Sequence, residues 1–346
     1  MSAQTPKGYS WKLPFAWQEI VLLLVILLEL IYFNAAGRNF LRADNVSNII
    51  RHSTEIGLLA LVMMPIILTG GIDLSVGSLL GLCAVLFGKM CEEGGLSPAV
   101  AGVFTVGLGA LAGGCNAGLI TWLRLPPLIV TLGTYSLFRG LAEAITKGTA
   151  TYSKFPESFL AFGSGKFLGL PIQAWIFVVA VIAVWLLVHQ TTFGRSFRAI
   201  GFTQDGAQYA GIPVQQRVAF AYVLAGAVAG LAAIVYTARV TQARADAGSG
   251  YELAAITAVV LGGTSIFGGI GTVPGTLLGV AAIAILSNGL SRIPSVISIS
   301  RELSGMLTGA LLLLALAGGA LSKILADRRL RNQSLVKPTS PQSTAS

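Results

Sequence analysis

The stretch that decides the fold is residues 55–91, which read EIGLLALVMMPIILTGGIDLSVGSLLGLCAVLFGKMC. It contains two apolar runs, 55–71 and 74–91, and a glycine pair and one acid, Asp73, lie where the runs meet. A helix that spans a bilayer needs about 20 mostly apolar residues, so each run is a candidate membrane helix. Because glycine favours the end of a helix, the stretch predicts two spanning helices separated by a break.

The composition of the whole chain agrees with this interpretation. Hydrophobic residues make up 54% of the 346 positions and charged residues only 11%, against about 25% charged residues in ordinary soluble proteins. The mean hydropathy is +0.77. These values exclude a disordered chain, a nucleic-acid-binding domain and a typical cytosolic enzyme, and they leave the lipid bilayer as the expected environment.

Ten apolar segments can be placed along the chain, and several are short or contain Gly and Pro, so broken helices are expected. The segments lie at 17–33, 55–71, 74–91, 98–122, 126–146, 171–190, 217–239, 252–267, 274–290 and 302–320. The chain is therefore predicted to be an all-α, polytopic integral membrane protein with about ten transmembrane helices. One transmembrane domain over 17–322 is expected between an N-terminal segment, 1–16, and a basic, disordered tail, 323–346.

Positive charge predicts the orientation of the chain in the membrane. The net charge is +9, and Lys and Arg collect on cytoplasmic loops. An even number of spans places both ends on one side, and the basic tail and the arginine-bearing loop 191–217 predict that this side is the cytoplasm. Arg38, Arg42 and Arg51 then fall on the outer side, which leaves an offset first span as an open alternative.

Asp73 has two interpretations. A carboxylate at the centre of a spanning helix costs about 2.5–3.5 kcal/mol on insertion scales, and a position beside a helix N-terminus lowers that cost. Asp73 is therefore expected either to cap the helix that follows it or to lie in a break that lines a translocation path or a gate.

A polar loop, 191–213, carries the second motif. Thr203 or Asp205 is a suitable N-cap for a short helix, Gly211 suits the position after its end, and Pro213 prevents its continuation. The loop is expected to carry a helix of one or two turns. It is either an ordinary loop with cytoplasmic arginines or the element through which a soluble motor moves a membrane subunit.

The third motif is the glycine-rich stretch 250–272, in which small residues favour close packing of helices over direct contact with a ligand. The chain also contains a weak internal sequence similarity. GSLLG at 77–81 follows GGIDLSV, and GTLLG at 275–279 follows GGIGTVP, so an internal repeat of the kind found in transporters and a chance match remain equal alternatives.

Four stretches taken together resemble the membrane permease of ribose-type ABC sugar importers. They are GGIDLSVGS (70–78), LPPLIVTLGT (125–134), FGRSFRAIGFTQDGAQYAGIPV (193–214) and GYELAAITAVVLGGTSIFGGIGT (250–272), and they follow one another in order within residues 50–320. The chain departs from the family pattern at Ile270, at Gly206 and in 299–303. These departures weaken the transfer of any named substrate.

The resemblance implies a permease of the bacterial inner membrane that translocates a monosaccharide such as ribose or rhamnose. Its implied partners are a cytoplasmic ABC ATPase that binds ATP and Mg²⁺, a periplasmic sugar-binding protein, and a second, identical or similar permease. No cofactor, metal or nucleic acid is expected on this chain, which is not an enzyme. The residues implied to couple to the ATPase are Gly194, Arg195, Arg198, Asp205, Gly206, Ala207, Gly211 and Pro213. The residues expected in the path or its hinges are Asp73, Ser75, Asn116, Thr131, Glu143 and Asn288, each with the alternative of an interhelical hydrogen-bond partner.

Other functions stay open. The chain has no G-x-x-x-x-G-K-[ST] motif, and GSGKF at 163–167 lacks its spacing, so it does not hydrolyse ATP by a P-loop mechanism. An ion-coupled secondary transporter would need paired intramembrane acids, and a membrane enzyme would need a metal or nucleophile cluster. Within the importer class, autoinducer-2 and branched-chain amino acids are alternative cargoes.

Overall fold

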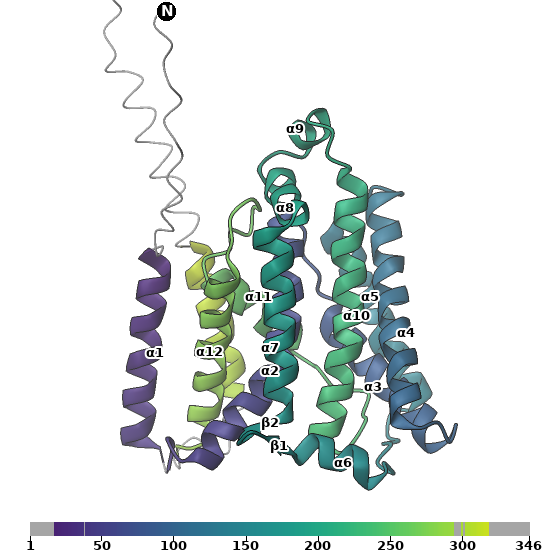
Figure 1. Cartoon of the computed structure of the whole chain (residues 1–346), viewed down its shortest axis with the longest axis vertical. Coiled ribbons are helices and arrows are strands. Elements are labelled where there is room, and N and C mark those ends of the chain that lie inside the picture. The colour runs from purple at the N-terminus through teal and green to yellow at the C-terminus, as the bar shows by residue number, and fades with distance from the viewer. Residues whose placement is uncertain (1–16, 38, 294–298, 300–301, 318–346) are drawn as a thin grey trace, which may run out of the picture.

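The computed structural model describes residues 17–37, 39–293, 299 and 302–317, and these residues are mostly helical (Figure 1). The expected N-terminal segment 1–16 and the tail 323–346 lie outside them. The elements are α1 (Trp17–Ala36), α2 (Ala43–Leu68), α3 (Val76–Glu92), α4 (Pro98–Thr121), α5 (Pro127–Ile145), α6 (Glu157–Ser164), β1 (Lys166–Phe167), β2 (Leu170–Pro171), α7 (Ile172–Trp185), the π-helical turn η1 (Leu186–Gln190), α8 (Thr192–Phe202), α9 (Gln204–Tyr209), α10 (Val214–Val240), α11 (Tyr251–Leu261) and α12 (Val273–Leu290). A further helix covers Glu302–Ala317.

Each of the ten apolar segments of the sequence corresponds to a helix. Seven helical segments of the described residues are long and apolar enough to cross a membrane, and two shorter apolar helices accompany them, Tyr251–Leu261 and Glu302–Ala317. The seven are Glu19–Ala36, Ala43–Leu68, Pro98–Thr121, Pro127–Ile145, Ile172–Gln190, Val214–Val240 and Val273–Leu290. The chain is therefore an all-α, polytopic membrane protein.

Helix α2 begins at Ala43, well before the apolar run that predicted it. Its first turns are polar, and this polarity hid them from a search for apolar residues. Arg51 in this part of α2 donates a hydrogen bond to the Ser164 carbonyl oxygen at the end of α6, over 2.6 Å. The segment before the second span is thus held against the segment that contains α6, and Arg51 has a structural reason to be where it is.

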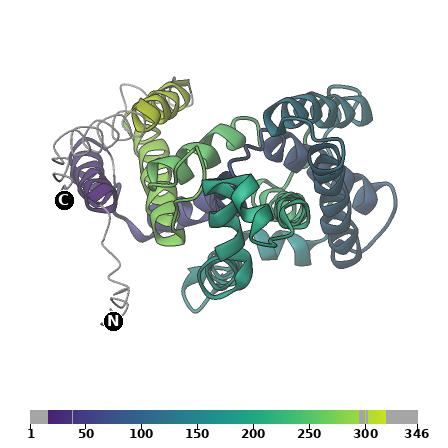
Figure 2. The same ribbon diagram turned by 90° about the horizontal axis from the view of Figure 1, so that it is seen from above.

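Helix α10 lies at the centre of the bundle, in contact with α2, α3 and α4. The crossing of α10 and α4 is very close because glycines face each other there: a Cβ atom on Gly109 or Gly113 would meet the backbone of α10. Small residues permit such approach between membrane helices. Seen from above, α1 lies at one edge of the bundle and α4 and α5 at the other (Figure 2).

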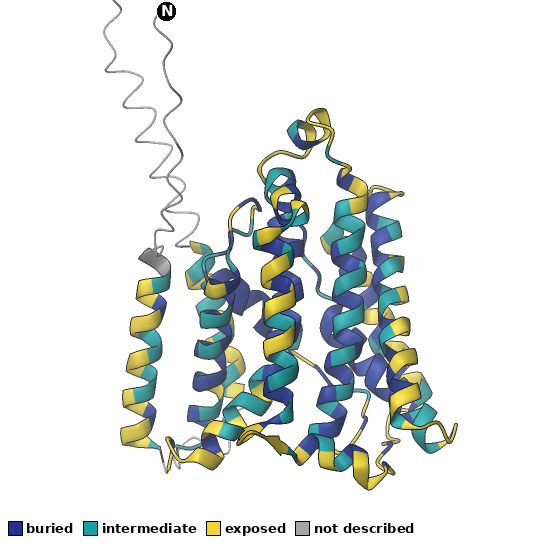
Figure 3. Cartoon of the chain, in the orientation of Figure 1, coloured by how far each residue is buried: buried dark blue, intermediate teal, exposed yellow. Residues whose placement is uncertain are grey.

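Burial separates a core from a lipid-facing surface (Figure 3). Most of α2 and α3 is buried, including a continuous buried run from Gly57 to Leu68. Helices α1, α4 and α5 instead expose large apolar side chains, such as Leu28, Val103 and Ile129. Such apolar patches suit a lipid or protein environment rather than water.

The two ends of the bundle differ. One end, called the α9 end below, carries α8, α9 and the first turn of α1 (Figure 1). There the Thr272 hydroxyl donates a hydrogen bond to Glu19 of α1, over 3.1 Å. The opposite end, called the hairpin end, carries α6 and the antiparallel pair β1–β2.

Candidate functional site

Two capped helices form the arginine-bearing loop at the α9 end. The Thr191 hydroxyl accepts a hydrogen bond from the Phe193 amide over 3.1 Å and begins α8. The Thr203 hydroxyl accepts one from the Gly206 amide over 3.3 Å and begins α9. Gly211 follows the end of α9 with φ +78°, a conformation that glycine adopts without strain. The predicted cap at Thr203 and the predicted stop at Gly211 are both confirmed.

Helix α8 was not predicted from the sequence, which indicated only one short helix between glycines. Its apolar side chains, Phe193, Phe197 and Ile200, follow a helical spacing of four and then three residues. Phe197 and Ile200 are buried. This apolar spacing, together with Thr191 as the N-cap residue, is the sequence signal that could have predicted α8.

The residues implied to couple to an ATPase differ in what their side chains can reach. Arg195 and Asp205 are exposed at the α9 end. Arg198 is half-buried and donates to the Val188 carbonyl oxygen over 3.2 Å. Ala207 is buried in a small core with Ile200 and Val214, which joins α8 and α9 to α10. Arg195 and Asp205 are therefore available to a partner, whereas Arg198 and Ala207 hold the loop together.

The remaining residues of this set shape the backbone. A Cβ atom on Gly194 would collide with the Val188 carbonyl, so glycine is needed where α8 turns away from η1. Gly206 lies in the first turn of α9, against the Thr203 side chain. Pro213 precedes the first residue of α10. These three residues set the path of the loop.

The break between α2 and α3 centres on Asp73. Helix α2 ends at Leu68, and Gly70 follows with φ +82°. The Asp73 carboxylate accepts hydrogen bonds from the Ser75 amide, over 2.8 Å, and from the Ser75 hydroxyl, over 2.6 Å. Ser75 is itself the N-cap residue of α3. Asp73 therefore binds the residue at the N-cap position of α3, and Ser75 itself makes no side-chain capping bond to the helix. The capping interpretation placed Asp73 at the N-cap position, which is two residues later.

Neighbouring helices extend this network. The Asn116 side chain on α4 donates to the Ser75 hydroxyl over 2.9 Å. The Thr131 hydroxyl on α5 donates to the Ile72 carbonyl oxygen over 3.2 Å. Asp73, Ser75, Asn116 and Thr131 are all buried. The structure therefore brings four of the expected path residues into one cluster, called the Asp73 network below.

Two of the expected path residues lie elsewhere. Asn288 on α12 accepts a hydrogen bond from the Asn45 side chain on α2, over 2.8 Å. Glu143 is exposed near the end of α5. These two residues lie outside the Asp73 network, and their place in the path or its hinges stays a prediction. Polarity within an apolar run does not reveal which helices are neighbours.

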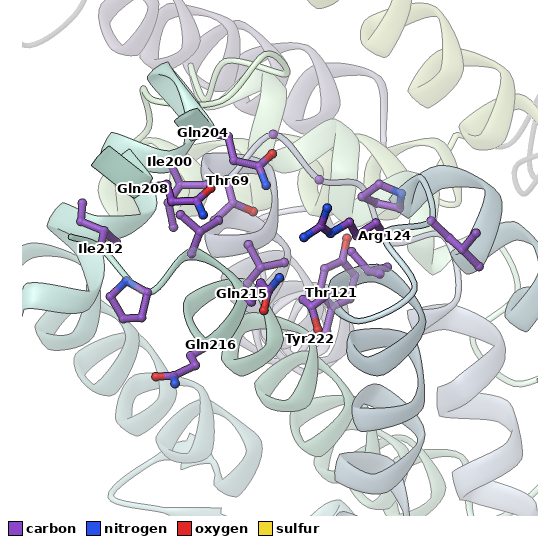
Figure 4. Close-up of a pocket in the computed structure, with 18 of the residues that line it drawn as sticks. Thr69, Thr121, Arg124, Ile200, Gln204, Gln208, Ile212, Gln215, Gln216 and Tyr222 are labelled. Carbon is purple, nitrogen blue, oxygen red and sulfur yellow. The ribbon is translucent and has the colours of Figure 1, made fainter. Parts of the chain in front are cut away.

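A polar cavity of about 860 Å³ opens between the break and the α8–α9 loop (Figure 4). Thr69, Gly70, Gly71 and Tyr222 line it from the bundle. From the loops and the start of α10 it is lined by polar side chains: Arg124, Gln204, Asp205, Gln208, Gln215 and Gln216. The sequence motifs did not reveal these glutamines, which lie on two separate helices, α9 and α10. The cavity joins the break and the loop into one candidate site.

A buried ion pair lies apart from this site. Arg239 on α10 donates to both carboxylate oxygens of Glu55 on α2, over 2.7 and 3.0 Å. Glu55 is fully buried. A buried carboxylate that is paired in this bidentate way has its charge compensated, so Glu55 serves as a cross-link between two helices.

A multi-pass helical bundle with broken helices, a polar cavity at a break and a helical loop above it defines the class of membrane transport permeases. A family model described as "Branched-chain amino acid transport system / permease component" matches residues 45–316. The chain belongs to this family of ABC importer permeases, and it is a transport subunit.

Individual curated relatives define the kind of permease more closely than the family model does. The chain is 37% identical over 317 residues to the autoinducer 2 import system permease protein LsrD of Photorhabdus temperata, a match that covers 89% of this chain and 92% of the relative. It is 36% identical to LsrD of Yersinia pseudotuberculosis, with the same shares, and to LsrD of Yersinia enterocolitica, with 89% of this chain and 93% of the relative. These relatives identify the chain as a permease of the ribose-type ABC importers. No solved structure matches the chain.

Proposed function

We propose that the chain moves a small polyhydroxylated cargo, with autoinducer-2 as the first candidate, across the bacterial inner membrane in an ATP-driven importer. The observation that carries the proposal is the cavity shared by the Asp73 break and the α8–α9 loop. Its lining offers amide, hydroxyl and guanidinium groups, which suit a hydroxyl-rich molecule. The names of the curated relatives support autoinducer-2 over other sugars.

In this proposal the bundle makes ten crossings, and the α9 end is cytoplasmic. Seven crossings are the long apolar helices. The other three are α3, α11 and Glu302–Ala317, of which α3 and α11 follow irregular segments that shorten them. Non-helical backbone at membrane depth is tolerated where protein buries it, as at the break before α3. Both termini then lie in the cytoplasm, and the single permease domain covers 17–322.

The partners follow from this orientation. A separate ATPase, which binds ATP and Mg²⁺, docks on Arg195, Asp205 and neighbouring exposed residues. A periplasmic binding protein delivers the cargo at the hairpin end, and a second permease completes the path. ATP binding moves the α8–α9 loops as rigid bodies, and the breaks respond by opening the path alternately to each side.

An ion-coupled mechanism receives less support. It needs acids that can exchange a proton or an ion along a path. Glu55 is engaged with Arg239, and Glu143 is exposed on α5. Asp73 lies two residues after Gly71, which lines the cavity, and the Ser75 amide donates a hydrogen bond to its carboxylate. These acids lie on α2, on α5 and in the break before α3, without a hydrogen-bonded connection among the described residues.

Copurification tests the partner. The ATPase subunit should copurify with the wild-type chain, and Arg195→Glu should weaken its binding, because the exposed charge is reversed at the proposed interface. Lys154→Glu makes the same change in the loop before α6, at the hairpin end, and serves as the matched control. Equal effects of the two variants would contradict docking at the α9 end.

A substrate panel tests the cargo. The permease, reconstituted with its ATPase and binding protein, should accumulate labelled autoinducer-2 faster than ribose, rhamnose or leucine. Accumulation of leucine alone would contradict a sugar-like cargo and identify the chain as an amino-acid permease. A preference for ribose or rhamnose would keep the importer class and replace the cargo.

A further inference from the structure

Three segments that are far apart in the sequence meet at the α9 end with almost no side chain between them. They are the end of α2 at Leu68–Gly70, the end of α8 at Gly201, and the loop glycines Gly268–Gly269. The Gly269 amide donates a hydrogen bond to the Leu68 carbonyl oxygen over 2.9 Å. This bond ties the break before α3 directly to the break between α11 and α12.

Gly201 closes this contact from the side of α8. A Cβ atom at Gly201 would collide with the Leu68 carbonyl oxygen and with the Gly269 amide nitrogen. In the same way, a Cβ atom at Gly268 would lie 2.8 Å from the Gly201 Cα and 3.0 Å from the Gly70 nitrogen. The atoms in conflict belong to the backbone, which cannot rotate away as a side-chain tip can.

The backbone conformations also require glycine here. Gly70, Gly268 and Gly269 have φ of +82°, +87° and +80°. L side chains adopt this region rarely. The aromatic ring of Phe202, the last residue of α8, covers the contact, and its carbons lie 3.1 Å from a Cβ position on Gly269. Three backbones therefore meet where α8 ends, without room for a Cβ atom at Gly201 or Gly268.

From this evidence we propose that Gly201 is the positioning residue that couples α8 to both helix breaks. The inference rests on the proposed function, in which the α8–α9 loop is moved by an ATPase. A displacement of α8 is transmitted through Gly201 to Leu68 and the Asp73 network on one side, and to Gly268–Gly269 and α12 on the other. Packed interfaces of this kind switch between discrete arrangements rather than deform continuously.

The functional test uses the complete importer in proteoliposomes and measures cargo transported per ATP hydrolysed. Gly201→Ala should lower this ratio about tenfold, while ATP hydrolysis and ATPase binding persist. The matched control is Gly107→Ala on α4, where nothing lies within 4 Å of the added Cβ atom and the ratio should be unchanged. An unchanged ratio in folded Gly201→Ala would overturn the proposal.

A second variant keeps the test decisive if Gly201→Ala does not fold. Phe202→Ala removes the ring above Gly269 without adding an atom to the contact, and the exposed ring contributes little to the core. It should also lower the transport ratio, with hydrogen exchange of the Gly269 amide becoming faster. A ratio equal to that of the wild type would overturn the proposal.

Hydrogen exchange of the purified permease separates this inference from the proposed function. Loosening of the contact in Gly201→Ala or Phe202→Ala should speed exchange in both 69–72 and 265–271, and Gly107→Ala should leave both segments unchanged. Exchange that changes only within α8 would contradict the contact, whatever the transport assay shows. If the wild-type complex shows no ATP-driven uptake, the proposed function fails, and the exchange result still decides whether Gly201 links the two breaks.

Discussion

The two helix breaks are built by different means. The break before α3 is held by side chains: Asp73 binds Ser75, and Asn116 binds Ser75 from α4. The break between α11 and α12 is held by backbone packing, because a Cβ atom at Gly262 would meet the Gly275 carbonyl. A side-chain network can exchange partners as helices move, whereas glycine packing holds two helices in one relation. In the proposed mechanism, we therefore expect the side-chain network of the first break to rearrange and the glycine packing of the second to transmit motion.

The sequence similarity between residues 77–81 and 275–279 falls at these two breaks. Each stretch lies at the beginning of a helix that follows a break, α3 in one case and α12 in the other. The two breaks also touch each other through the Gly269 amide and the Leu68 carbonyl. The two helix starts differ in their capping: the Thr272 hydroxyl accepts a hydrogen bond from the Gly275 amide over 3.1 Å at the start of α12, whereas Ser75 makes no side-chain capping bond at the start of α3.

The largest effect is expected at the second break. Gly262→Ala forces a methyl group against the Gly275 carbonyl and should cost about 3 kcal/mol, at the upper end for overpacking, because backbone atoms cannot yield. Gly71→Ala is the matched change at the first break, where the added atom meets the Tyr222 hydroxyl, the tip of a side chain, at 2.7 Å. Thermal unfolding in detergent should show the larger loss for Gly262→Ala. The reverse order would refute the comparison.

An intermediate effect is expected at Asp73. Asp73→Ala leaves the Ser75 amide and hydroxyl buried without their acceptor, at a cost of about 1–2 kcal/mol. Asp73→Asn retains an acceptor oxygen for the Ser75 amide and hydroxyl, so its loss of stability should be smaller. Unfolding curves of the two variants measure the difference. Equal losses would mean that the carboxylate does not organise the first break.

The smallest effect on stability is expected at the asparagines. Asn116→Ala removes the bond to Ser75, and Asn288→Ala removes the bond from Asn45. Each should cost about 0.6 kcal/mol, the average for interhelical hydrogen bonds in membranes. Only Asn116 belongs to the Asp73 network, so only Asn116→Ala should slow uptake. If Asn288→Ala slowed uptake equally, the claim that the Asp73 network has a specific role in transport would be contradicted.

The sequence predicted the positions of the helices better than it predicted which helices and loops contact each other. Apolar runs located every long helix, and cap chemistry at Thr203 and Gly211 located α9. The polar first turns of α2 were missed because they carry no apolar signal, and α8 was missed because its polar face resembled a loop. The contact of Gly201 with Leu68 and Gly269 could not be predicted, since each glycine was visible in the sequence but its partner is set by tertiary packing.

ATP dependence of transport tests the central claim most directly. The wild-type chain is reconstituted in proteoliposomes with its ATPase and binding protein, and ATP is supplied on the side of the membrane that carries the ATPase. Uptake of labelled autoinducer-2 is then measured with and without an ionophore that dissipates ion gradients. The account predicts uptake that requires ATP hydrolysis and is unchanged by the ionophore. Uptake that persists without ATP and stops when the ion gradient collapses would contradict it.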